Sequence, residues 1–198
     1  MIAIIDYGMG NLGSVKKAFD FLSIESFVTS DGRDLKKADK IVLPGVGAFE
    51  DAMNNLRQYK LTEQITDEIK NGKPFLGICL GLQLLFDYSE EGNHPSGLSV
   101  LKGAVKKFDE SIALKIPHMG WNNIEAKEMN YLSSFNQQYF YFVHSFYVEP
   151  VEKMACAYTV YGNQFVSAIE KDNILACQFH PEKSGEAGLG LLKKWAEK

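Results

Sequence analysis

Short apolar runs alternate with amphipathic stretches through the first half of the chain. The apolar runs lie at residues 2–6, 26–29, 40–43 and 74–78. Between them, apolar side chains recur with the spacing of a helix that buries one face, as Leu61, Ile65 and Ile69 do. Strands that are apolar on both faces and alternate with helices indicate a parallel sheet covered by helices.

The pattern changes in the second half, where runs of strand-forming residues are separated by turn signals. Gly162-Asn163 and Asp172-Asn173 predict turns between antiparallel strands. The predicted strands are residues 114–116, 139–147, 155–161, 164–169 and 174–179, and a final helix is predicted at 187–196. We therefore expect an α/β fold with a mixed, mainly parallel central sheet flanked by helices and an antiparallel extension in the C-terminal half.

The composition fits one compact domain. A chain of 198 residues with 45% hydrophobic content can bury one sizeable core, so we expect residues 1–198 to form a single domain. A net charge of -4 without any basic block argues against nucleic-acid binding. The chain starts without a basic leader and its apolar stretches are too short to span a membrane, so we expect a cytoplasmic protein.

The three cysteines, Cys79, Cys156 and Cys177, form an odd count without paired spacing, which predicts free thiols. No cluster of histidines and carboxylates has the spacing of metal ligands, and we expect neither a metal nor another cofactor.

Cys79 lies where an apolar run ends and a helical pattern begins, in Gly77-Ile78-Cys79-Leu80-Gly81. A strand-to-helix turn presents such a side chain above the edge of a sheet, and small neighbours let the turn close. The following helix would offer free N–H groups and a positive dipole end, which favour a thiolate. The alternative is a buried cysteine acting as a small hydrophobe, which is the simplest interpretation of Cys156 and Cys177.

His180 and Glu182 follow the last apolar strand, in Gln178-Phe179-His180-Pro181-Glu182. The imidazole would take a proton from Cys79 and later return one to a leaving amine, while the carboxylate would hold the ring in the useful tautomer. A surface His-Pro turn with a solvated acid is the alternative. Together, the three residues predict a Cys-His-Glu triad.

The segment Pro44-Gly45-Val46-Gly47 ends another predicted parallel strand, on the edge where α/β sheets place their sites. Glycines permit a peptide to turn its N–H inward. This segment could therefore supply one oxyanion donor, with the N–H of Leu80 as the other. It could also be a plain loop.

Residues 8–13 form a Gly-x-Gly-x-x-Gly match after a strand, and Asp31 lies at a suitable distance for the acid of a dinucleotide fold. The sequence leaves this alternative open, but a cysteine triad explains more of the chain.

Three segments, in chain order, resemble the class I glutamine amidotransferase family. They are Leu43-Pro44-Gly45-Val46-Gly47, Gly77-Ile78-Cys79-Leu80-Gly81-Leu82-Gln83 and His180-Pro181-Glu182. Three more segments resemble the branch of that family that serves a cyclase of histidine biosynthesis. They are Asp6-Tyr7-Gly8-Met9-Gly10-Asn11, Pro117-His118-Met119-Gly120-Trp121-Asn122 and Tyr141-Phe142-Val143-His144-Ser145-Phe146-Tyr147. The resemblance spans nearly the whole chain, and it makes the Gly-x-Gly-x-x-Gly match a coincidence.

The resemblance implies that the thiolate of Cys79 attacks the side-chain amide of glutamine, with His180 as acid and then base, to give ammonia and glutamate. It also assigns two groups of residues. Gly45, Val46 and Gly47 should line the oxyanion side, and Gln83 together with the backbone around His144 and Ser145 should hold the glutamine.

The resemblance also implies a partner, because ammonia released into bulk water would be protonated and lost, and no synthase module fits in this chain. In the family, the partner is a (β/α)8-barrel cyclase that uses a phosphorylated ribulosyl intermediate, and the two subunits form a heterodimer. Residues expected at this interface are Met9, Asn11, His118, Trp121 and Asn122. For Trp121, core anchoring is the alternative to an interface role.

A regulatory hypothesis concerns the oxyanion segment. If Val46 can hold its N–H away from the oxyanion site, the free subunit would be nearly idle until the partner and its substrate shift the population. Three rivals remain for the chain as a whole: a glutaminase subunit of another synthase (pyridoxal phosphate or anthranilate), a non-catalytic regulatory module of the same fold, and a dinucleotide-binding protein.

Overall fold

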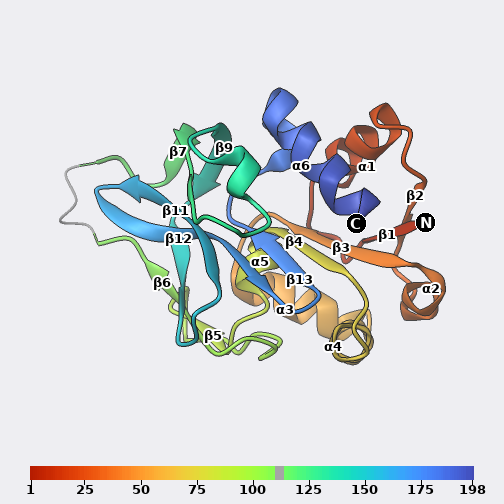
Figure 1. The fold of residues 1–198 in the computed structure, drawn as a ribbon. Coiled ribbons are helices and arrows are strands. Elements are labelled where there is room, and N and C mark those ends of the chain that lie inside the picture. Colours follow the sequence, from red (N-terminus) through yellow and green to blue (C-terminus); the bar gives the residue numbers. More distant parts are fainter. Residues whose placement is uncertain (110–113) are drawn as a thin grey trace.

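The computed structural model describes residues 1–109 and 114–198 and shows a central sheet between two layers of helices (Figure 1). The strands are β1 (Ile2–Ile5), β2 (Ser26–Thr29), β3 (Lys40–Gly45), β4 (Phe75–Cys79), β5 (Tyr88–Ser89), β6 (Gly103–Lys107), β7 (His118–Asn123), β8 (Glu125–Ala126), β9 (Tyr139–His144), β10 (Phe146–Pro150), β11 (Ala155–Tyr161), β12 (Asn163–Lys171) and β13 (Ile174–Cys177). The helices are α1 (Leu12–Phe21), α2 (Gly32–Lys37), α3 (Phe49–Gln58), α4 (Thr62–Lys70), α5 (Leu80–Gln83) and α6 (Gly185–Glu197), with 3-10 turns η1 (Ser133–Phe135) and η2 (Pro181–Lys183).

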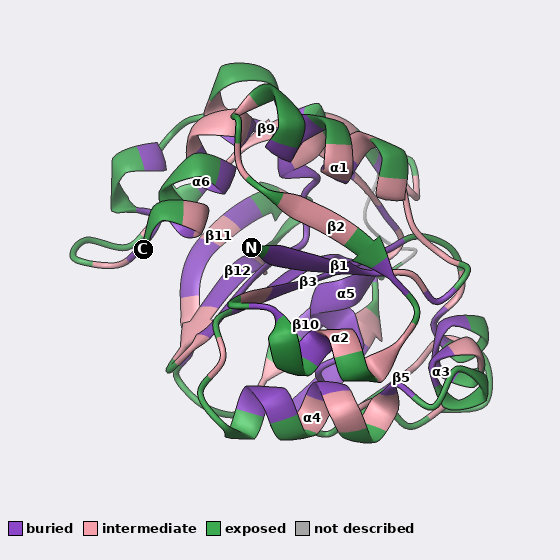
Figure 2. Ribbon diagram, turned by 90° about the vertical axis from the view of Figure 1, so that its right-hand side faces the viewer, coloured by how far each residue is buried: buried purple, intermediate pink, exposed green. Residues whose placement is uncertain are grey.

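The parallel part of the sheet has the strand order β2-β1-β3-β4-β13. Alternate residues of β1 enter different cores, with Ala3 and Ile5 on one face and Ile2 and Ile4 on the other. Helices α2, α3 and α4 cover the first core, and α1 and α6 cover the second. Figure 2 shows the buried strands enclosed between these layers. The prediction of a parallel sheet covered by helices is confirmed.

The antiparallel extension continues from β13 through β12, β10 and β6, with β11 added on β12. Within the described ranges, eleven strands belong to this one sheet. The β11–β12 and β12–β13 turns pass through Gly162 (φ 75°) and Asp172 (φ 52°), residue types that tolerate the left-handed region. The two hairpins predicted from these turns are confirmed.

Two predicted strands differ from the structure. Residues 114–116 form no strand. The single strand predicted over 139–147 is divided at Ser145, because β9 pairs with β7 in a separate two-stranded sheet whereas β10 pairs with β6 and β12. A continuous run of strand-forming residues does not show where pairing changes from one sheet to another, so the pattern could not locate this break.

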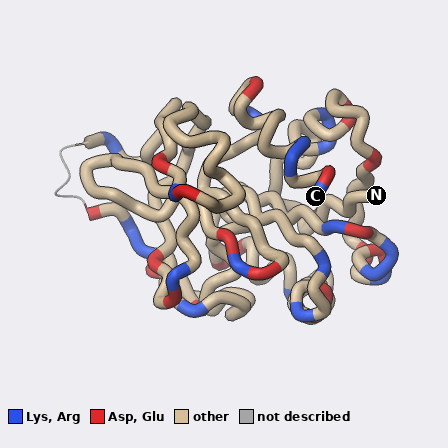
Figure 3. Tube along the Cα trace, in the orientation of Figure 1, with Lys and Arg blue, Asp and Glu red and all other residues tan. Residues whose placement is uncertain are grey.

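Positions of positively and negatively charged residues are interspersed along the described parts of the chain (Figure 3). In residues 1–109 and 114–198, no helix combines the length and the apolar character needed to cross a bilayer.

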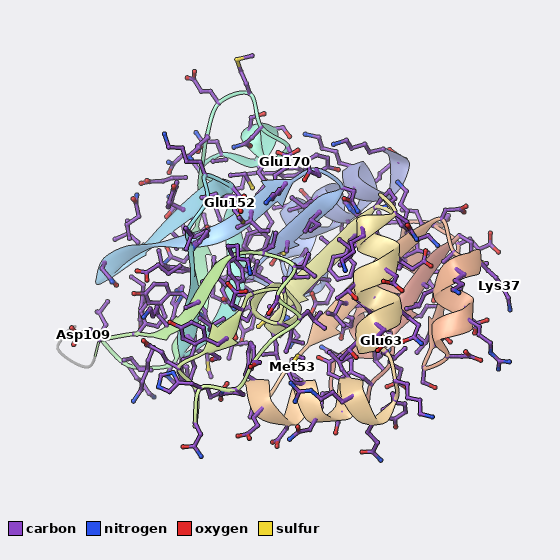
Figure 4. All side chains as sticks on the ribbon, turned by 90° about the horizontal axis from the view of Figure 1, so that it is seen from below. Lys37, Met53, Glu63, Asp109, Glu152 and Glu170 are labelled. Atoms are coloured by element: carbon purple, nitrogen blue, oxygen red, sulfur yellow. The ribbon has the colours of Figure 1, made fainter. Side chains whose placement is uncertain are left out.

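Helices α3 and α4 lie across the lower face, where Figure 4 labels Met53 on α3 and Glu63 on α4. The backbone N–H of Phe49, the first residue of α3, donates to Oε2 of Glu91 at 2.8 Å. This carboxylate satisfies one of the free donors at the start of the helix. It thereby ties the 88–91 region to the segment that follows β3.

Candidate active site

Cys79 ends β4 in a strained conformation, with φ 55° and ψ -110°. A non-glycine residue at positive φ is uncommon, and a strained strand-to-helix turn is the setting of an exposed nucleophile in related architectures. The adjacent strand β3 ends in register, with Gly45 opposite Cys79. The two loops expected to form the site therefore leave the same edge of the sheet side by side.

The glycines around Cys79 are required by close backbone approach. A Cβ on Gly81 would lie 1.9 Å from the carbonyl oxygen of Leu43, and one on Gly77 would lie 2.9 Å from the carbonyl oxygen of Gly81. The expectation that small neighbours let the turn close is confirmed. The helix that follows, α5, spans a single turn, so its dipole supports the thiol less than that of a long helix would.

His180 and Glu182 form a buried pair. Nδ1 of His180 lies 2.8 Å from Oε1 of Glu182, and both side chains are 1% exposed. The backbone of His180 is held from two sides: its N–H donates to the carbonyl of Tyr141 at 2.9 Å, and its carbonyl accepts from Oγ of Ser184 at 2.6 Å. The solvated His-Pro turn considered as an alternative is not what the structure shows.

The electrostatics of His180 are dominated by its neighbours. Burial lowers the pKa of the ring, but the sulfur of Cys79 and the carboxylate of Glu182 outweigh it and raise this pKa to about 10. Nε2 of His180 is buried and has no well-formed hydrogen bond to any described residue. Catalytic hydrogen bonds are often long or poorly aligned before substrate binds. The arrangement favours a protonated imidazole ring at His180.

A cavity of about 300 Å³ lies over Cys79. The predicted residues that line it are Val46, Gly47, Cys79, Leu80, Gln83, His144, Ser145 and His180. Glu182 does not line the cavity, and it contacts Nδ1 of His180 from outside the cavity. Gly45 is also not in the lining; a Cβ there would lie 2.4 Å from Oη of Tyr7, so this glycine lets Tyr7 pack under the loop.

Two polar residues of the site were absent from the sequence predictions. Nε2 of Gln178 lies 3.6 Å from Sγ of Cys79 and donates to it. The alternation of a strand could have found Gln178, because a residue two positions before His180 points to the same side. Glu91 also lines the cavity, and it comes from an irregular loop whose sequence carries no signal for this position.

The residues expected at a partner interface have different environments. Trp121 is 57% exposed on β7, beside Met119 at 62% and Tyr139 at 60%. Met9 and Asn11 are partly exposed in the loop before α1, and Met9 packs against Gly47, where a Cβ would lie 2.7 Å from the Met9 methyl carbon. His118, by contrast, is only 3% exposed, and its side chain lies on the buried face of β7.

The residue considered for a dinucleotide site has a structural role instead. Asp31, the candidate acid of a dinucleotide site, caps α2 by accepting from the N–H of Arg33 and pairs with its guanidinium. Across 1–109 and 114–198, no group of three or more His, Cys, Asp or Glu residues is placed to hold a metal ion.

The fold and the site together define an α/β protein with a cysteine on a strained strand-to-helix turn beside a buried His-Glu pair. The family model for Glutamine amidotransferase class-I matches residues 3–197, and the chain belongs to this family.

Similar proteins point to one branch of the family. The chain is 47% identical to Imidazole glycerol phosphate synthase subunit HisH 1 of Campylobacter jejuni subsp. jejuni, with 99% of each chain covered. It is 48% identical to Imidazole glycerol phosphate synthase subunit HisH of Caldanaerobacter subterraneus subsp. tengcongensis, covering 100% of this chain and 98% of the relative.

Among solved structures, a glutamine amidotransferase superposes with a TM-score of 0.77 at 17% identity, with all of both chains covered. PurLQS from Thermotoga maritima superposes with a TM-score of 0.76 at 17% identity, covering 99% of this chain and 97% of the other. At this identity the likeness concerns the fold alone, and it agrees with the expected fold class.

Proposed function

We propose that this chain is the glutamine amidotransferase subunit of imidazole glycerol phosphate synthase and hydrolyses glutamine at Cys79. The observation that carries the proposal is the cavity that brings Cys79 and His180 together in front of Glu182. Sequence identities of 47% and 48% over the full length of the chain to subunits of imidazole glycerol phosphate synthase support the assignment to this branch of the family.

The chemistry begins with attack of the Cys79 thiolate on the side-chain carbonyl carbon of glutamine. The backbone N–H groups of Val46 and Leu80, both residues of the cavity wall, stabilise the resulting oxyanion. The protonated ring of His180 then gives its proton to the departing ammonia, which leaves a thioester. Water, deprotonated by His180, attacks the thioester, and glutamate leaves as the thiolate is regenerated.

Several polar groups are available to hold the substrate. Gln83, His144 and Ser145 line the cavity as the family resemblance implies, together with Gly47, while Gly45 shapes the loop from behind. Glu91 adds a carboxylate to this wall. Oε2 of Glu91 already accepts a hydrogen bond from the N–H of Phe49 at the start of α3. The other carboxylate oxygen of Glu91 would therefore accept from the α-ammonium group of glutamine.

The product ammonia needs an enclosed path to an acceptor. We infer that the acceptor site belongs to a separate (β/α)8-barrel cyclase that binds this chain as a heterodimer and makes imidazole glycerol phosphate and an aminoimidazole ribonucleotide. Exposed apolar side chains on β7 and β9, chiefly Met119, Trp121 and Tyr139, support a contact surface there. Met9 and Asn11, partly exposed before α1, are further candidate contacts, and Met9 packs against Gly47 of the oxyanion loop. A cytoplasmic location follows from this assignment.

The same loop supports the regulatory hypothesis. Gly47 has φ 97°, and Met9 packs against it, so a partner that contacts Met9 would reach the segment carrying Val46. We infer that the free chain hydrolyses glutamine very slowly. Binding of the cyclase and its acceptor substrate would then favour the conformation in which the Val46 N–H points to the oxyanion.

The decisive experiment is a glutamate-release assay on the purified chain, alone and with a candidate cyclase and its phosphorylated ribulosyl substrate. Strong activation only with both supports the proposal. Fast hydrolysis by the chain alone contradicts the quiet resting state. Activation by a pyridoxal phosphate or anthranilate synthase partner instead would assign the chain to a rival branch, and no glutamate release under any condition would favour the regulatory module.

A further inference from the structure

Two histidines that the glutaminase chemistry does not consume lie in a continuous hydrogen-bonded chain to the nucleophile. His118 and His144 are cross-strand partners on β7 and β9, 3% and 6% exposed. Nδ1 of His118 lies 3.0 Å from Nε2 of His144. Since β7 also carries Trp121 on its exposed side, this pair connects the exposed strand with the wall of the cavity.

The directions of these hydrogen bonds are fixed from both ends. At the outer end, the Asn122 amide is oriented because its Oδ1 accepts from the N–H of Asn123 at 2.9 Å and its Nδ2 donates to the carbonyl of Val160 at 3.0 Å. The second hydrogen on Nδ2 points to Nε2 of His118, at 3.3 Å. His118 therefore accepts at Nε2 and, as a neutral ring, donates from Nδ1.

At the inner end, Nδ1 of His144 lies 2.8 Å from the carbonyl oxygen of Phe146, which can only accept. His144 must therefore donate from Nδ1 and accept at Nε2, which matches the donor presented by His118. Protonation of either ring would set two donors against each other. Burial lowers the pKa of His118 to about 4 and that of His144 to about 3, so both rings remain neutral at physiological pH.

The chain continues from Phe146 to the sulfur. The Phe146 carbonyl also accepts from Nε2 of Gln83 at 3.0 Å, and the same Nε2 donates to Oε1 of Gln178 at 2.9 Å. Both hydrogens of the Gln83 amide are thus used, and the Gln178 amide is oriented with its Nε2 toward Sγ of Cys79 at 3.6 Å. Each group has one orientation that satisfies its neighbours.

The ring of His118 is also held by stacking. It lies between Phe142, with ring centroids 4.8 Å apart and an interplanar angle of 26°, and Tyr161, at 4.0 Å and 27°. Such contacts leave the ring little freedom to flip.

We propose that His118 and His144 are positioning residues, which link the Trp121 strand to Cys79 by orienting the Phe146 carbonyl and the amides of Gln83 and Gln178 so that an N–H faces the sulfur of Cys79. The relevance to glutamine hydrolysis rests on the proposed function. The physical claim about the orientation of the two rings and the reactivity of Cys79 does not.

The first test is nitrogen NMR of the imidazole rings in the wild-type chain. The expected result is that both His118 and His144 are neutral Nδ1–H tautomers, with a nitrogen–nitrogen coupling across the hydrogen bond that joins them. Either ring in the Nε2–H tautomer, or titrating near its ordinary pKa of about 6.5, would overturn the proposal. This measurement needs no variant and no substrate.

The second test measures alkylation of Cys79 by iodoacetamide, read by mass spectrometry of its peptide. His118→Phe keeps an aromatic ring between Phe142 and Tyr161 but removes both nitrogens, and we expect it to slow alkylation by about 3- to 10-fold. His118→Asn can place an amide nitrogen near the position of Nδ1, and it should restore most of the rate. His94→Asn, at an exposed loop histidine, is the control and should leave the rate unchanged.

Glutaminase kinetics with the cyclase and its acceptor complete the test. His118→Phe should lower kcat more than it raises KM, with rescue by His118→Asn. An unchanged alkylation rate and unchanged kinetics in His118→Phe would overturn the positioning role. If the NMR and alkylation results hold but the chain never hydrolyses glutamine, the proposed function fails while the positioning of Cys79 stands.

Discussion

Nδ1 of His180 and Oε1 of Glu182 lie 2.8 Å apart, and the protein shields both side chains almost completely from solvent. A carboxylate in this position determines which nitrogen of the ring carries a proton in the neutral state and stabilises the charged state. In the proposed reaction, the other ring nitrogen, Nε2, is the one available to Cys79 and to a leaving amine.

Replacement of Glu182 by glutamine should therefore impair proton transfer while preserving shape. The amide can donate to Nδ1 and so favour the wrong tautomer, and we expect kcat for glutamine hydrolysis in the cyclase complex to fall by at least about 10²-fold. Steady-state glutamate release measures this. Glu186→Gln, which removes the charge of an exposed carboxylate on α6, serves as the matched control. A variant Glu182→Gln with wild-type kcat would show that the carboxylate has no part in the reaction.

The same substitution should change how stability depends on pH. The folded-state pKa of His180, about 10, lies above its ordinary value of 6.5. Its stabilising contribution is therefore fully present below about pH 6.5 and is lost as the pH rises through about 10. The loss of unfolding free energy in Glu182→Gln should be larger at about pH 6 than at about pH 10.5. Urea unfolding at the two pH values tests the sign, and a pH-independent difference would contradict it.

Cys79→Ser should abolish glutaminase activity without unfolding the chain, because a hydroxyl is a much weaker nucleophile than a thiolate. We expect a loss of at least about 10³-fold in kcat, with an unchanged urea midpoint. Cys156→Ala is the control. Burial and the carboxylate of Glu170 raise the pKa of Cys156 to about 12, so this thiol stays neutral and its removal should leave hydrolysis intact. Residual activity in Cys79→Ser above that level would point to another nucleophile.

Gly81→Ala should destabilise the protein through the turn at Cys79. The new Cβ would lie 1.9 Å from the Leu43 carbonyl oxygen, and we expect a loss of about 1–3 kcal/mol or more in the free energy of unfolding. Gly13→Ala is the matched control, because Gly13 lies within α1 and, apart from its chain neighbours and the backbone of its own helix, no atom lies within 4 Å of the added carbon. That change should stabilise by about 0.5–1 kcal/mol. Equal effects of the two substitutions in urea unfolding would contradict the steric argument.

Trp121→Ala should weaken coupling to the cyclase while leaving the His180–Glu182 pair intact. An exposed aromatic side chain at the centre of an interface contributes about 2 kcal/mol or more, so partner affinity should fall by at least about 10-fold. The ratio of glutamine consumed to product formed should rise as ammonia escapes. Met129→Ala, at a fully exposed methionine, provides the comparison. Unchanged affinity and an unchanged ratio would rule out the interface role.

Local signals in the sequence were enough to predict the parallel half of the fold. Apolar runs on both faces and helical spacing located β1, β3 and β4 within two residues of their observed bounds. The helix α2 was missed, since its six residues carry one buried apolar side chain, Leu35, and a cap at Asp31 in place of a periodic pattern. Likewise, β7 was not predicted because its Gly-Trp-Asn segment resembles a loop, and pairing with β9 is what makes it a strand.

The sequence by itself determined the candidates for nucleophile, base and orienting acid, because glycine-flanked turns and a His-Pro-Glu segment after a strand are local features. Only the tertiary structure decided how deeply His180 and Glu182 are buried, that Gln178 donates to Cys79, and that His118 lies behind the exposed face instead of on it. These properties depend on which strands become neighbours. Burial and hydrogen-bond partners are set by residues that are distant in the chain, and no local pattern records them.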